Sequence, residues 1–564
     1  MLLFGFLFVW SWLVAVVECV TTQASAGAGS WCLPGEPCWP DAGSWAALNA
    51  SVGGTLSAPG SAAYANASAM EYVNWQFEDG HAASPLALPA LAVTARSAAD
   101  VAAALRFAAA ARIRVAVKST GHTYTGRSTA AGSLLLYLHA MRAIEWHAAF
   151  DDGCGGGSGG SGQGNPPAVS VAPGVNFGAL YEAVDSRGFV VVGGGGSTVG
   201  AAGGYVLGGG HSVLSRSLGL GADNVLGFEL VVPNGTTLAV SPCAAPELFW
   251  AALGGGGGTF GVMTRATHRL HPAPAGGVFG VKAKYPMSGG GANASGWLAA
   301  VVAAQPALAT QWGCYFECLP AIGAISALAT WDVSCLHYGG GDADAAAAGI
   351  APLKAAFDAH PARKATWAMT PFPSFWAWKR GDSGGDTSGV ASALTSRLFP
   401  PSALAAPASA SALAATILDG VAKGVNMQIA LVLGGAAATG GARNDTSTTS
   451  VSGHMRDGLW HVVGATGWIP LEPDALQRAA LRKVRAFGDA LRELAPDSGA
   501  YLNENDWLEP GWRSSFFGDS YAYARLLEAK RSVDPLGLLE CHNCVGSNDT
   551  AAEWDSFPMS ANEQ

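Results

Sequence analysis

The chain has 564 residues, of which 49% are apolar and only 13% are charged, so it can bury a large core and is not typical of a disordered protein. Its length predicts two or three lobes. The net charge of −10 argues against nucleic acid as a partner, because phosphates require a basic surface, and against a substrate that carries many negative charges.

The first segment, MLLFGFLFVWSWLVAVV, is apolar and is followed by the small-residue pattern Ala24-Ser25-Ala26. This arrangement predicts a signal peptide over residues 1–26 and therefore secretion. No Lys or Arg precedes the apolar run, so an uncleaved signal anchor is the alternative. No second apolar stretch is long enough to predict a membrane span.

Nine cysteines follow the predicted signal peptide. Cys32–Cys38 is a plausible local disulfide, and a second pairing is expected among Cys314, Cys318 and Cys335. The odd number leaves at least one free thiol. Export would also allow N-glycosylation at six Asn-x-Ser/Thr sites, which begin at Asn49, Asn66, Asn234, Asn293, Asn444 and Asn548.

Regular elements begin after an irregular segment that ends near residue 83. Residues 91–93 predict a strand, Ser97 and Asp100 predict the cap of a helix over residues 101–108, and alternation over residues 113–117 predicts a second strand. Further on, the pattern predicts a flexible glycine-serine loop, a strand, a helix, another strand and a hairpin at residues 153–165, 169–171, 177–187, 189–192 and 228–240.

The region after about residue 274 is richer in alanine. An aromatic cluster between Trp367 and Trp378 is expected to be core rather than a substrate platform. A long amphipathic helix is predicted from the spacing of Leu476, Ala480, Val484, Phe487, Leu491 and Leu494.

Residues 119–128, STGHTYTGRS, carry the first chemical signal. Gly121 and Gly126 allow a tight turn whose N–H groups can face a phosphate. His122 lies within this turn, and a neutral imidazole is a competent nucleophile toward an electrophilic cofactor carbon. A loop histidine with a hydrogen-bonding role is the alternative for an isolated Gly-His pair.

A glycine-rich region, GGGGSTVGAAGGYVLGGGHSVLSRSLGLGADNV, covers residues 193–225. Its glycines would let the main chain lie against a flat or diphosphate-bearing ligand. The run is too long for a nicotinamide-binding fingerprint, and no phosphate loop of the G-K-[ST] type is present. A structural loop is the alternative.

The order of these segments is specific. VKSTGHTYTGRS, the glycine-rich region, ELFWAALGGGGGTFGVMT and the C-terminal YLNENDWLEPGWRSSFFG together resemble the FAD-linked oxidases of the vanillyl-alcohol oxidase superfamily, and among them the berberine-bridge-enzyme-like proteins. The resemblance covers residues 31–60, 86–273 and 500–547, and is loose between them.

The resemblance implies an α+β fold with a two-subdomain, PCMH-type FAD-binding domain and an inserted substrate domain, whose antiparallel sheet is backed by helices. The implied divisions are an N-terminal segment (27–83), the FAD-binding domain (84–273), the substrate-binding domain (274–498), a berberine-bridge-like segment that packs on the FAD domain (499–550), and a tail (551–564).

The resemblance also implies site residues. His122 matches the histidine that bonds covalently to the flavin. The other expected cofactor contacts are Thr120, Gly121, Thr123, Tyr124, Gly126, Arg127, Thr198, Gly200, Gly203, Gly204, Gly209, Gly210, His211, Gly261, Val262 and Asn503. Many relatives carry a second covalent link through a cysteine, but Gly196 occupies that position here, so a single link is predicted.

Tyr501 is the first candidate for the catalytic base, provided that a nearby charge lowers its pKa, and ring packing is its alternative role. Glu504 is the second candidate, and Glu317 and Asp332 could face the substrate. Cys541 and Cys544 resemble half of a metal site without a second half, so a disulfide or buried thiols are expected and no metal is predicted.

These observations predict a secreted FAD-dependent oxidase that acts on a small alcohol, sugar or amine, with molecular oxygen as acceptor and hydrogen peroxide as product. The alternatives are a dehydrogenase with another acceptor and a ligand-binding flavoprotein without turnover.

Overall fold

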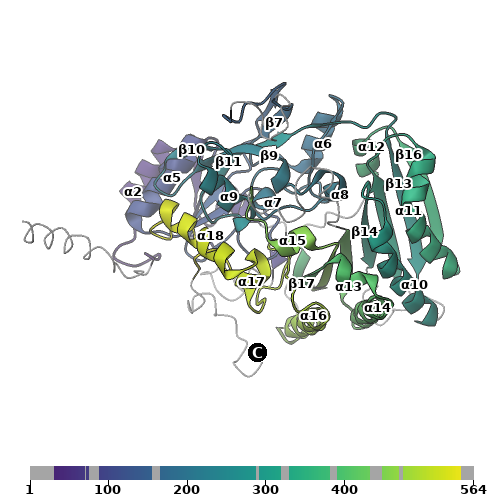
Figure 1. Ribbon diagram of the computed structural model, residues 1–564. Helices are drawn as coiled ribbons and strands as arrows, with labels where there is room; N and C mark the ends of the chain where they lie inside the picture. The colour runs from purple at the N-terminus through teal and green to yellow at the C-terminus, as the bar shows by residue number, and fades with distance from the viewer. Residues whose placement is uncertain are drawn as a thin grey trace, which may run out of the picture.

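The computed structural model describes residues 31–69, 72–74, 88–154, 165–287, 291–318, 329–381, 390–431, 448–468 and 474–547. The predicted signal peptide, the tail and most of the glycine-serine loop lie outside these residues. Three larger sheets organise the described chain, two on the left of Figure 1 and one on its right.

The first sheet has the strand order β1-β3-β5-β4, in which β3 and β4 run parallel to β5 and β1 is antiparallel to β3. Helix α5 connects β3 to β4, and the N-terminal helix α2 packs on α5. The bounds are α2 Ala42–Ser51, β1 Thr55–Ser57, α3 Ala62–Ser68, β3 Leu91–Thr94, α5 Ala98–Ala111, β4 Val115–Lys118 and β5 Leu134–Tyr137.

The predicted cap of α5 is present. Ser97 Oγ accepts a hydrogen bond from the backbone N–H of Asp100. The Asp100 carboxylate accepts from the N–H groups of Arg96 and Gly53, so it also fixes the chain that leads from α2 into the sheet.

The second sheet is antiparallel, with the order β10-β9-β11-β7-β6, and it contains the predicted hairpin of β9 and β10. The strand predicted at residues 189–192 is only two residues long and pairs with β12 outside this sheet. The bounds are β6 Ile144–His147, β7 Ala168–Val171, α6 Phe177–Asp185, β8 Phe189–Val190, α7 Gly204–Leu207, α8 Ser215–Leu218, η2 Ala222–Asn224, β9 Val225–Val231, β10 Thr237–Val240, α9 Pro246–Gly255, β11 Val262–Arg269 and β12 His271–Pro272.

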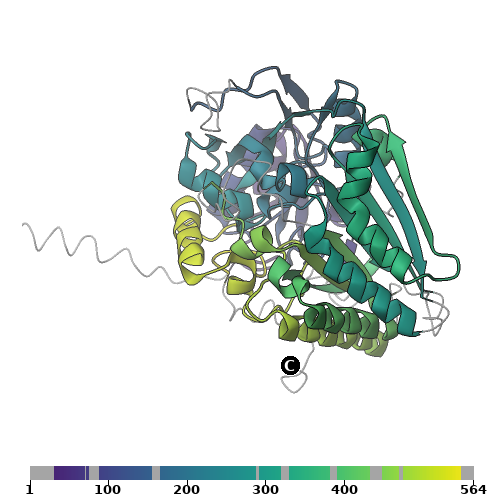
Figure 2. The same ribbon diagram turned by 45° about the vertical axis from the view of Figure 1, so that its right-hand side comes forward.

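The third sheet has eight strands in the order β16-β13-β15-β14-β18-β19-β17-β2. Its long helices lie together on one face (Figures 1 and 2). Strand β2 comes from the N-terminal segment and pairs in parallel with β17, whereas every other pairing is antiparallel. The strand bounds are β2 Tyr72–Asn74, β13 Val278–Pro286, β14 Trp312–Cys318, β15 Thr330–His337, β16 Thr366–Phe372, β17 Val390–Phe399, β18 Asn426–Leu431 and β19 Trp460–Trp468.

This arrangement confirms the expected α+β class and the antiparallel sheet backed by helices. The helices that accompany the sheet are α10 Gly291–Ala304, η3 Gln305–Ala307, α11 Ala343–Ala359, α12 Phe375–Lys379, α13 Pro401–Ala405, α14 Pro407–Ala422, α15 Gly453–Asp457 and α16 Asp474–Leu494.

Helix α16 is the amphipathic helix that the sequence predicts. Val484, Phe487 and Leu491 are buried against the sheet, but Leu476 is 54% exposed, so its assignment to the apolar face is wrong. Leu476 lies in the first turn of the helix. Trp378, from the predicted aromatic cluster, is core.

The C-terminal segment returns to the side of the molecule that the first two sheets occupy. Its helices α17 (Trp512–Phe517) and α18 (Ser520–Val533) are drawn in yellow at the lower left of Figure 1. Arg525 pairs with Glu247 of α9 at 2.8 Å, and the buried Lys530 Nζ donates to the carbonyl of Thr259 at 2.7 Å. Residues far apart in sequence therefore build one side of the molecule.

Four disulfides join the described cysteines: Cys32–Cys38, Cys154–Cys243, Cys314–Cys335 and Cys541–Cys544. The first and third agree with the sequence-based pairings. The odd number of cysteines required at least one free thiol, and among the described cysteines it is Cys318, which is buried. Cys154–Cys243 lies at the base of the glycine-serine loop. Among the described residues, no helix is both long and apolar enough to cross a membrane.

Candidate functional site

A cavity of about 990 Å³ lies between the glycine-rich loops of the first two sheets and the open face of the eight-stranded sheet. It is large enough for a ligand of cofactor size. Fourteen of the predicted site residues line it: Thr120, Gly121, His122, Thr123, Tyr124, Arg127, Gly200, Gly203, Gly204, His211, Gly261, Tyr501, Asn503 and Glu504.

Five predicted contacts do not line this cavity: Gly126, Thr198, Gly209, Gly210 and Val262. Thr198 and Gly210 lie behind the cavity wall and make hydrogen bonds to lining residues, Thr198 to His122 and Gly210 to Tyr501. The Val262 side chain, at the first position of β11, is completely buried in the core under the first sheet.

His122 lies in the loop that follows β4. Its Nε2 is 2.6 Å from Thr198 Oγ1, a contact that joins this loop to the glycine-rich region. A second link between the same segments runs from the N–H of Gly200 to Thr120 Oγ1. These bonds hold the His122 loop against the glycine-rich region.

The surroundings of the Arg127 guanidinium show whether the cavity suits an anionic group. Its Nη2 donates to the carbonyl of Asn543 at 3.3 Å, while Nε and Nη1 are closed to solvent and have no hydrogen-bond partner among the described residues. Burial lowers the pKa of this guanidinium to about 10, so it stays charged at neutral pH. A shielded arginine without a carboxylate partner in the described chain fits a ligand diphosphate.

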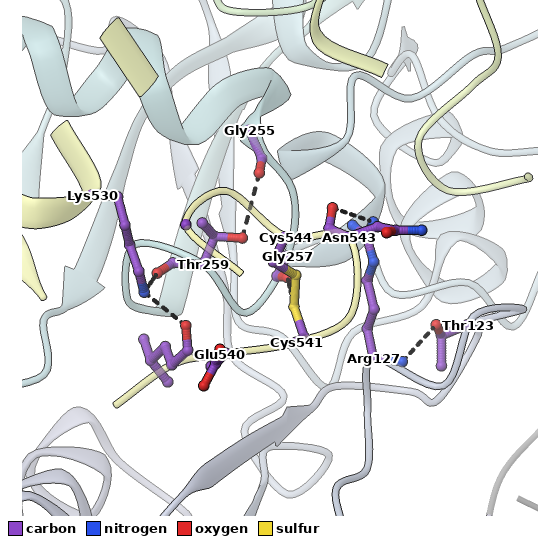
Figure 3. Close-up of a disulfide and its surroundings, with 12 residues drawn as sticks. Thr123, Arg127, Gly255, Gly257, Thr259, Lys530, Glu540, Cys541, Asn543 and Cys544 are labelled. Atoms are coloured by element: carbon purple, nitrogen blue, oxygen red, sulfur yellow. Dashed lines mark hydrogen bonds between the residues drawn. A yellow bond between two sulfur atoms is a disulfide. The ribbon is translucent and has the colours of Figure 1, made fainter. Parts of the chain in front are cut away.

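Figure 3 shows how the C-terminal segment holds this arginine. The Cys541–Cys544 disulfide lies beside Gly257, which lines the cavity, and Asn543 faces Arg127 from the turn that the disulfide closes. The Asn543 side chain donates to the carbonyl of Trp507. The predicted cysteine pair is therefore a structural disulfide next to the cavity. We call Cys541–Cys544 and the turn that it closes the clamp.

Tyr501 and Asn503 form another part of the cavity wall. The Tyr501 hydroxyl accepts hydrogen bonds from the N–H of Gly210 at 3.1 Å and from Asn503 Nδ2 at 2.8 Å. Asn503 approaches Gly208 so closely that a Cβ there would lie 2.4 Å from its Nδ2. Glycine is required at that position because any side chain would displace Asn503.

Tyr501 was the first candidate for the catalytic base only if a nearby charge lowered its pKa, and its pKa is instead raised. Burial raises it well above the ordinary value, and the neighbouring Glu504 carboxylate raises it further. The expected lowering by a nearby charge is therefore wrong, since the nearest charge is negative.

Glu504 is the acidic group in the part of the cavity wall that Tyr501 and Asn503 form. Its Oε1 is 3.1 Å from Nε2 of His211. Burial pushes the pKa of Glu504 upward, but the nearby histidines, His211 first, outweigh burial, and the net pKa is lowered. At neutral pH the cavity therefore contains a carboxylate that can accept a proton.

The eight-stranded sheet contributes Glu317 and Asp332, which the sequence analysis named as possible substrate-facing residues, and further polar residues that sequence reasoning missed. Lys284 Nζ lies 2.9 Å from Asp332 Oδ1, and Gln428 Nε2 donates to Glu317 Oε1 at 3.3 Å. The alternation of these strands turns the polar side chains toward the cavity, a signal that becomes useful only once the strand register is known. The lining residues of this wall include Lys282, Lys284, Tyr315, Glu317, Asp332 and Gln428.

Similarity to known proteins identifies the family of this chain. The family model for an FAD binding domain matches residues 89–241. An uncharacterized FAD-linked oxidoreductase of Arthroderma benhamiae is 31% identical over 95% of this chain and 96% of its own length. The chain belongs to the FAD-linked oxidoreductases.

Two further similarities indicate the group of FAD-linked oxidoreductases to which this enzyme belongs. The VAO-type flavoprotein oxidase VAO615 of Thermothelomyces thermophilus is 29% identical over 94% of the chain and 95% of its own length. The crystal structure of the VAO-type flavoprotein MtVAO713 from Myceliophthora thermophila C1 superposes with a TM-score of 0.78 at 25% identity, covering 92% of this chain and 97% of that one. The enzyme is an FAD-dependent oxidoreductase of the vanillyl-alcohol oxidase (VAO) superfamily.

Proposed function

We propose that the enzyme holds FAD through one covalent bond to His122 and oxidises a small alcohol, sugar or amine. The observation that carries this proposal is the cavity itself, whose wall contains the shielded Arg127, His122 and the partly buried carboxylate of Glu504. Bound FAD would accept a hydride from a carbon of the substrate.

Residues of the protein would bind the cofactor and accept the proton of the substrate. Arg127 and the loop from Thr120 to Tyr124 would surround the diphosphate, and Asn503 would hold the ring end. Glu504 accepts the proton that leaves the substrate hydroxyl or amine, because it is a carboxylate at neutral pH and lines the cavity. Tyr501, with its raised pKa, serves as a neutral hydrogen-bonding group.

Molecular oxygen is the acceptor we favour, with hydrogen peroxide as product, since VAO615 is named an oxidase. Secretion is supported by the four disulfides and by exposed Asn49, Asn66 and Asn234 at glycosylation sites. The charged and polar wall supports a substrate with several polar groups. The division of the chain at residues 84, 274 and 499 remains our prediction.

The test is a visible spectrum of acid-precipitated and resolubilised protein. Flavin should remain with the wild-type pellet and leave His122→Ala, whereas His360→Ala, changed outside the cavity, should retain it. Release of flavin from the wild type would refute the covalent bond.

Peroxide release is then screened over alcohols, sugars and amines. A substrate that bleaches the flavin without oxygen consumption in air, but reduces an added quinone, would favour a dehydrogenase. No bleaching by any substrate would favour a flavoprotein without turnover.

A further inference from the structure

Three side chains that carry metal-binding atoms meet beside the cavity. Glu504 Oε1 is 3.1 Å from Nε2 of His211, and Glu504 Oε2 is 3.6 Å from Nδ1 of His461. One ligand atom from each of the three residues lies within 4.8 Å of the other two. Two ligands that bind one ion at about 2.1 Å, with bond angles of about 90–120°, are about 3.0–3.6 Å apart. Both contacts of Glu504 fall in this range.

His461 points to a ligand that the described chain does not supply. Its side chain is completely buried on β19, and neither ring nitrogen has a hydrogen-bond partner among the described residues. A buried polar group without a partner costs about 1–3 kcal/mol, so such groups in folded proteins generally bind something. The Nδ1 atom is too far from the Glu504 carboxylate for a direct hydrogen bond, but its distance suits two ligands of a shared ion.

The two imidazole rings have the separation that one ion between them would require. The ring centroids of His211 and His461 are 5.4 Å apart. In two imidazoles bound to one ion at a tetrahedral angle, each centroid is about 3.2 Å from the metal, so the centroids are about 5 Å apart. The Tyr501 ring packs at a steep angle against both histidines, with centroid distances of 5.4 and 5.6 Å. The pair therefore shares one supporting neighbour.

All three ligands stand on anchored backbone. His461 lies within the eight-stranded sheet, where β19 pairs with β17 and β18. The backbone carbonyl of His211 accepts a hydrogen bond from the Tyr205 hydroxyl at 2.9 Å, and that of Glu504 accepts from the Ser396 hydroxyl. Ligands on fixed backbone need little ordering before they bind an ion.

We propose that His211, His461 and Glu504 form a binding site for a divalent transition-metal ion of the zinc class. Imidazole nitrogens suit Zn²⁺ and its neighbours in the transition series, whereas Mg²⁺ and Ca²⁺ prefer oxygen ligands. His211 and Glu504 line the cavity and His461 does not, so the ion enters from the cavity and its remaining coordination positions face it. The sequence predicts no metal site, and these ligands lie on segments far apart in the chain.

The site should bind its ion reversibly. His211 Nδ1 and His461 Nε2, the second nitrogens of the two rings, are buried, and no described residue accepts a hydrogen bond from either. Such an acceptor orients a metal-bound histidine, and its loss generally lowers metal affinity about 10- to 100-fold. We therefore expect an ion that a chelator removes, rather than a structural metal.

The bound ion should inhibit substrate oxidation, a consequence that rests on the proposed function. A metal bound to Glu504 occupies the carboxylate lone pair that would otherwise accept the substrate proton. Its positive charge also opposes protonation of the carboxylate. The metal-free protein is then the active form, and the ion competes with the substrate proton for the same oxygen atoms.

The experiment measures zinc per chain in flavin-loaded protein that is dialysed first against EDTA and then against a series of free Zn²⁺ concentrations at neutral pH. The wild type should bind one ion that is lost from His211→Gln, His461→Gln and Glu504→Gln. Each variant lacks one ligand, so its affinity should fall more than about 100-fold. His360→Gln, which changes the histidine at the end of α11, should bind zinc as the wild type does, and excess Mg²⁺ should not displace the ion.

If His461→Gln does not fold, His211→Gln and Glu504→Gln test the same site from the cavity side. The proposal is overturned if the wild type binds no more zinc than these variants, or if Mg²⁺ displaces the ion as effectively as Zn²⁺ binds. Zinc that binds without slowing the bleaching of the flavin by a substrate would overturn the inhibitory role. The proposed function would fail differently, through flavin that is not attached to His122.

Discussion

The side chain of Arg127 donates from Nη2 to the carbonyl of Asn543, a residue 416 positions later in the chain. This bond joins the loop of His122 to the C-terminal segment at the end of the cavity where we place the FAD diphosphate. The remaining guanidinium nitrogens Nε and Nη1 are closed to solvent without a protein partner in the described chain, and so are positioned for a ligand.

Arg127→Gln should weaken FAD binding about 10- to 100-fold, because a hydrogen bond to a charged group contributes about 1.5–3 kcal/mol. The measurement is a titration of FAD into protein that carries His122→Ala, so that affinity is not masked by the covalent bond. Arg363→Gln, at an exposed position, is the control. Equal affinities for both variants would remove Arg127 from the cofactor site.

The Cys541–Cys544 disulfide closes the turn that holds Asn543 against Arg127 (Figure 3). Replacing both cysteines by serine should lower FAD affinity in the same titration, because the turn gains conformational freedom before it can hold the arginine. The matched control replaces Cys314 and Cys335, which cross-link β14 and β15 in the other lobe. A larger loss of affinity in the control would contradict this role for the clamp.

Gly196 lines the cavity at the position where the family resemblance implies the cysteine of a second covalent link. Gly196→Cys in the His122→Ala background should restore flavin that survives acid precipitation, since the new thiol would face the bound ring. Mass spectrometry of tryptic peptides would locate the bond. Flavin released as completely as from His122→Ala alone would show that this position is out of reach.

Stability should fall in mild acid because His268 is buried and neutral. Burial lowers its folded pKa to about 4 from the ordinary 6.5, so the unfolded chain takes up the proton first as pH falls. Stability that is complete above pH 6.5 is lost progressively down to pH 4, by about 3 kcal/mol for this one group. Urea unfolding at pH 7 and 4.5 measures the difference.

His268→Gln should show a smaller acid loss than the wild type, since glutamine does not titrate and can still donate to the carbonyl of Ala201, the partner of His268 Nε2. His360→Gln should keep the wild-type loss. An undiminished loss in His268→Gln would assign the acid sensitivity to other groups, such as His271, whose pKa burial also lowers to about 4.

Through its resemblance to the FAD-linked oxidases, the sequence alone predicted the cofactor class, the α+β fold and fourteen of the residues that line the cavity. Order and spacing were sufficient because the glycines and His122 belong to contiguous loops, whose backbone conformation depends mainly on local residue type. The hairpin, the cap at Ser97 and the Cys32–Cys38 pair are local for the same reason.

Only the tertiary structure decided the chemistry at Glu504. His211, His461 and Glu504 come from three distant segments, and a pKa depends on burial and on neighbours that a sequence does not place side by side. The raised pKa of Tyr501, the polar wall around Asp332 and the pairing of β2 with β17 arise in the same way. Each depends on contacts between residues that are far apart in the chain, because packing and strand register bring them together.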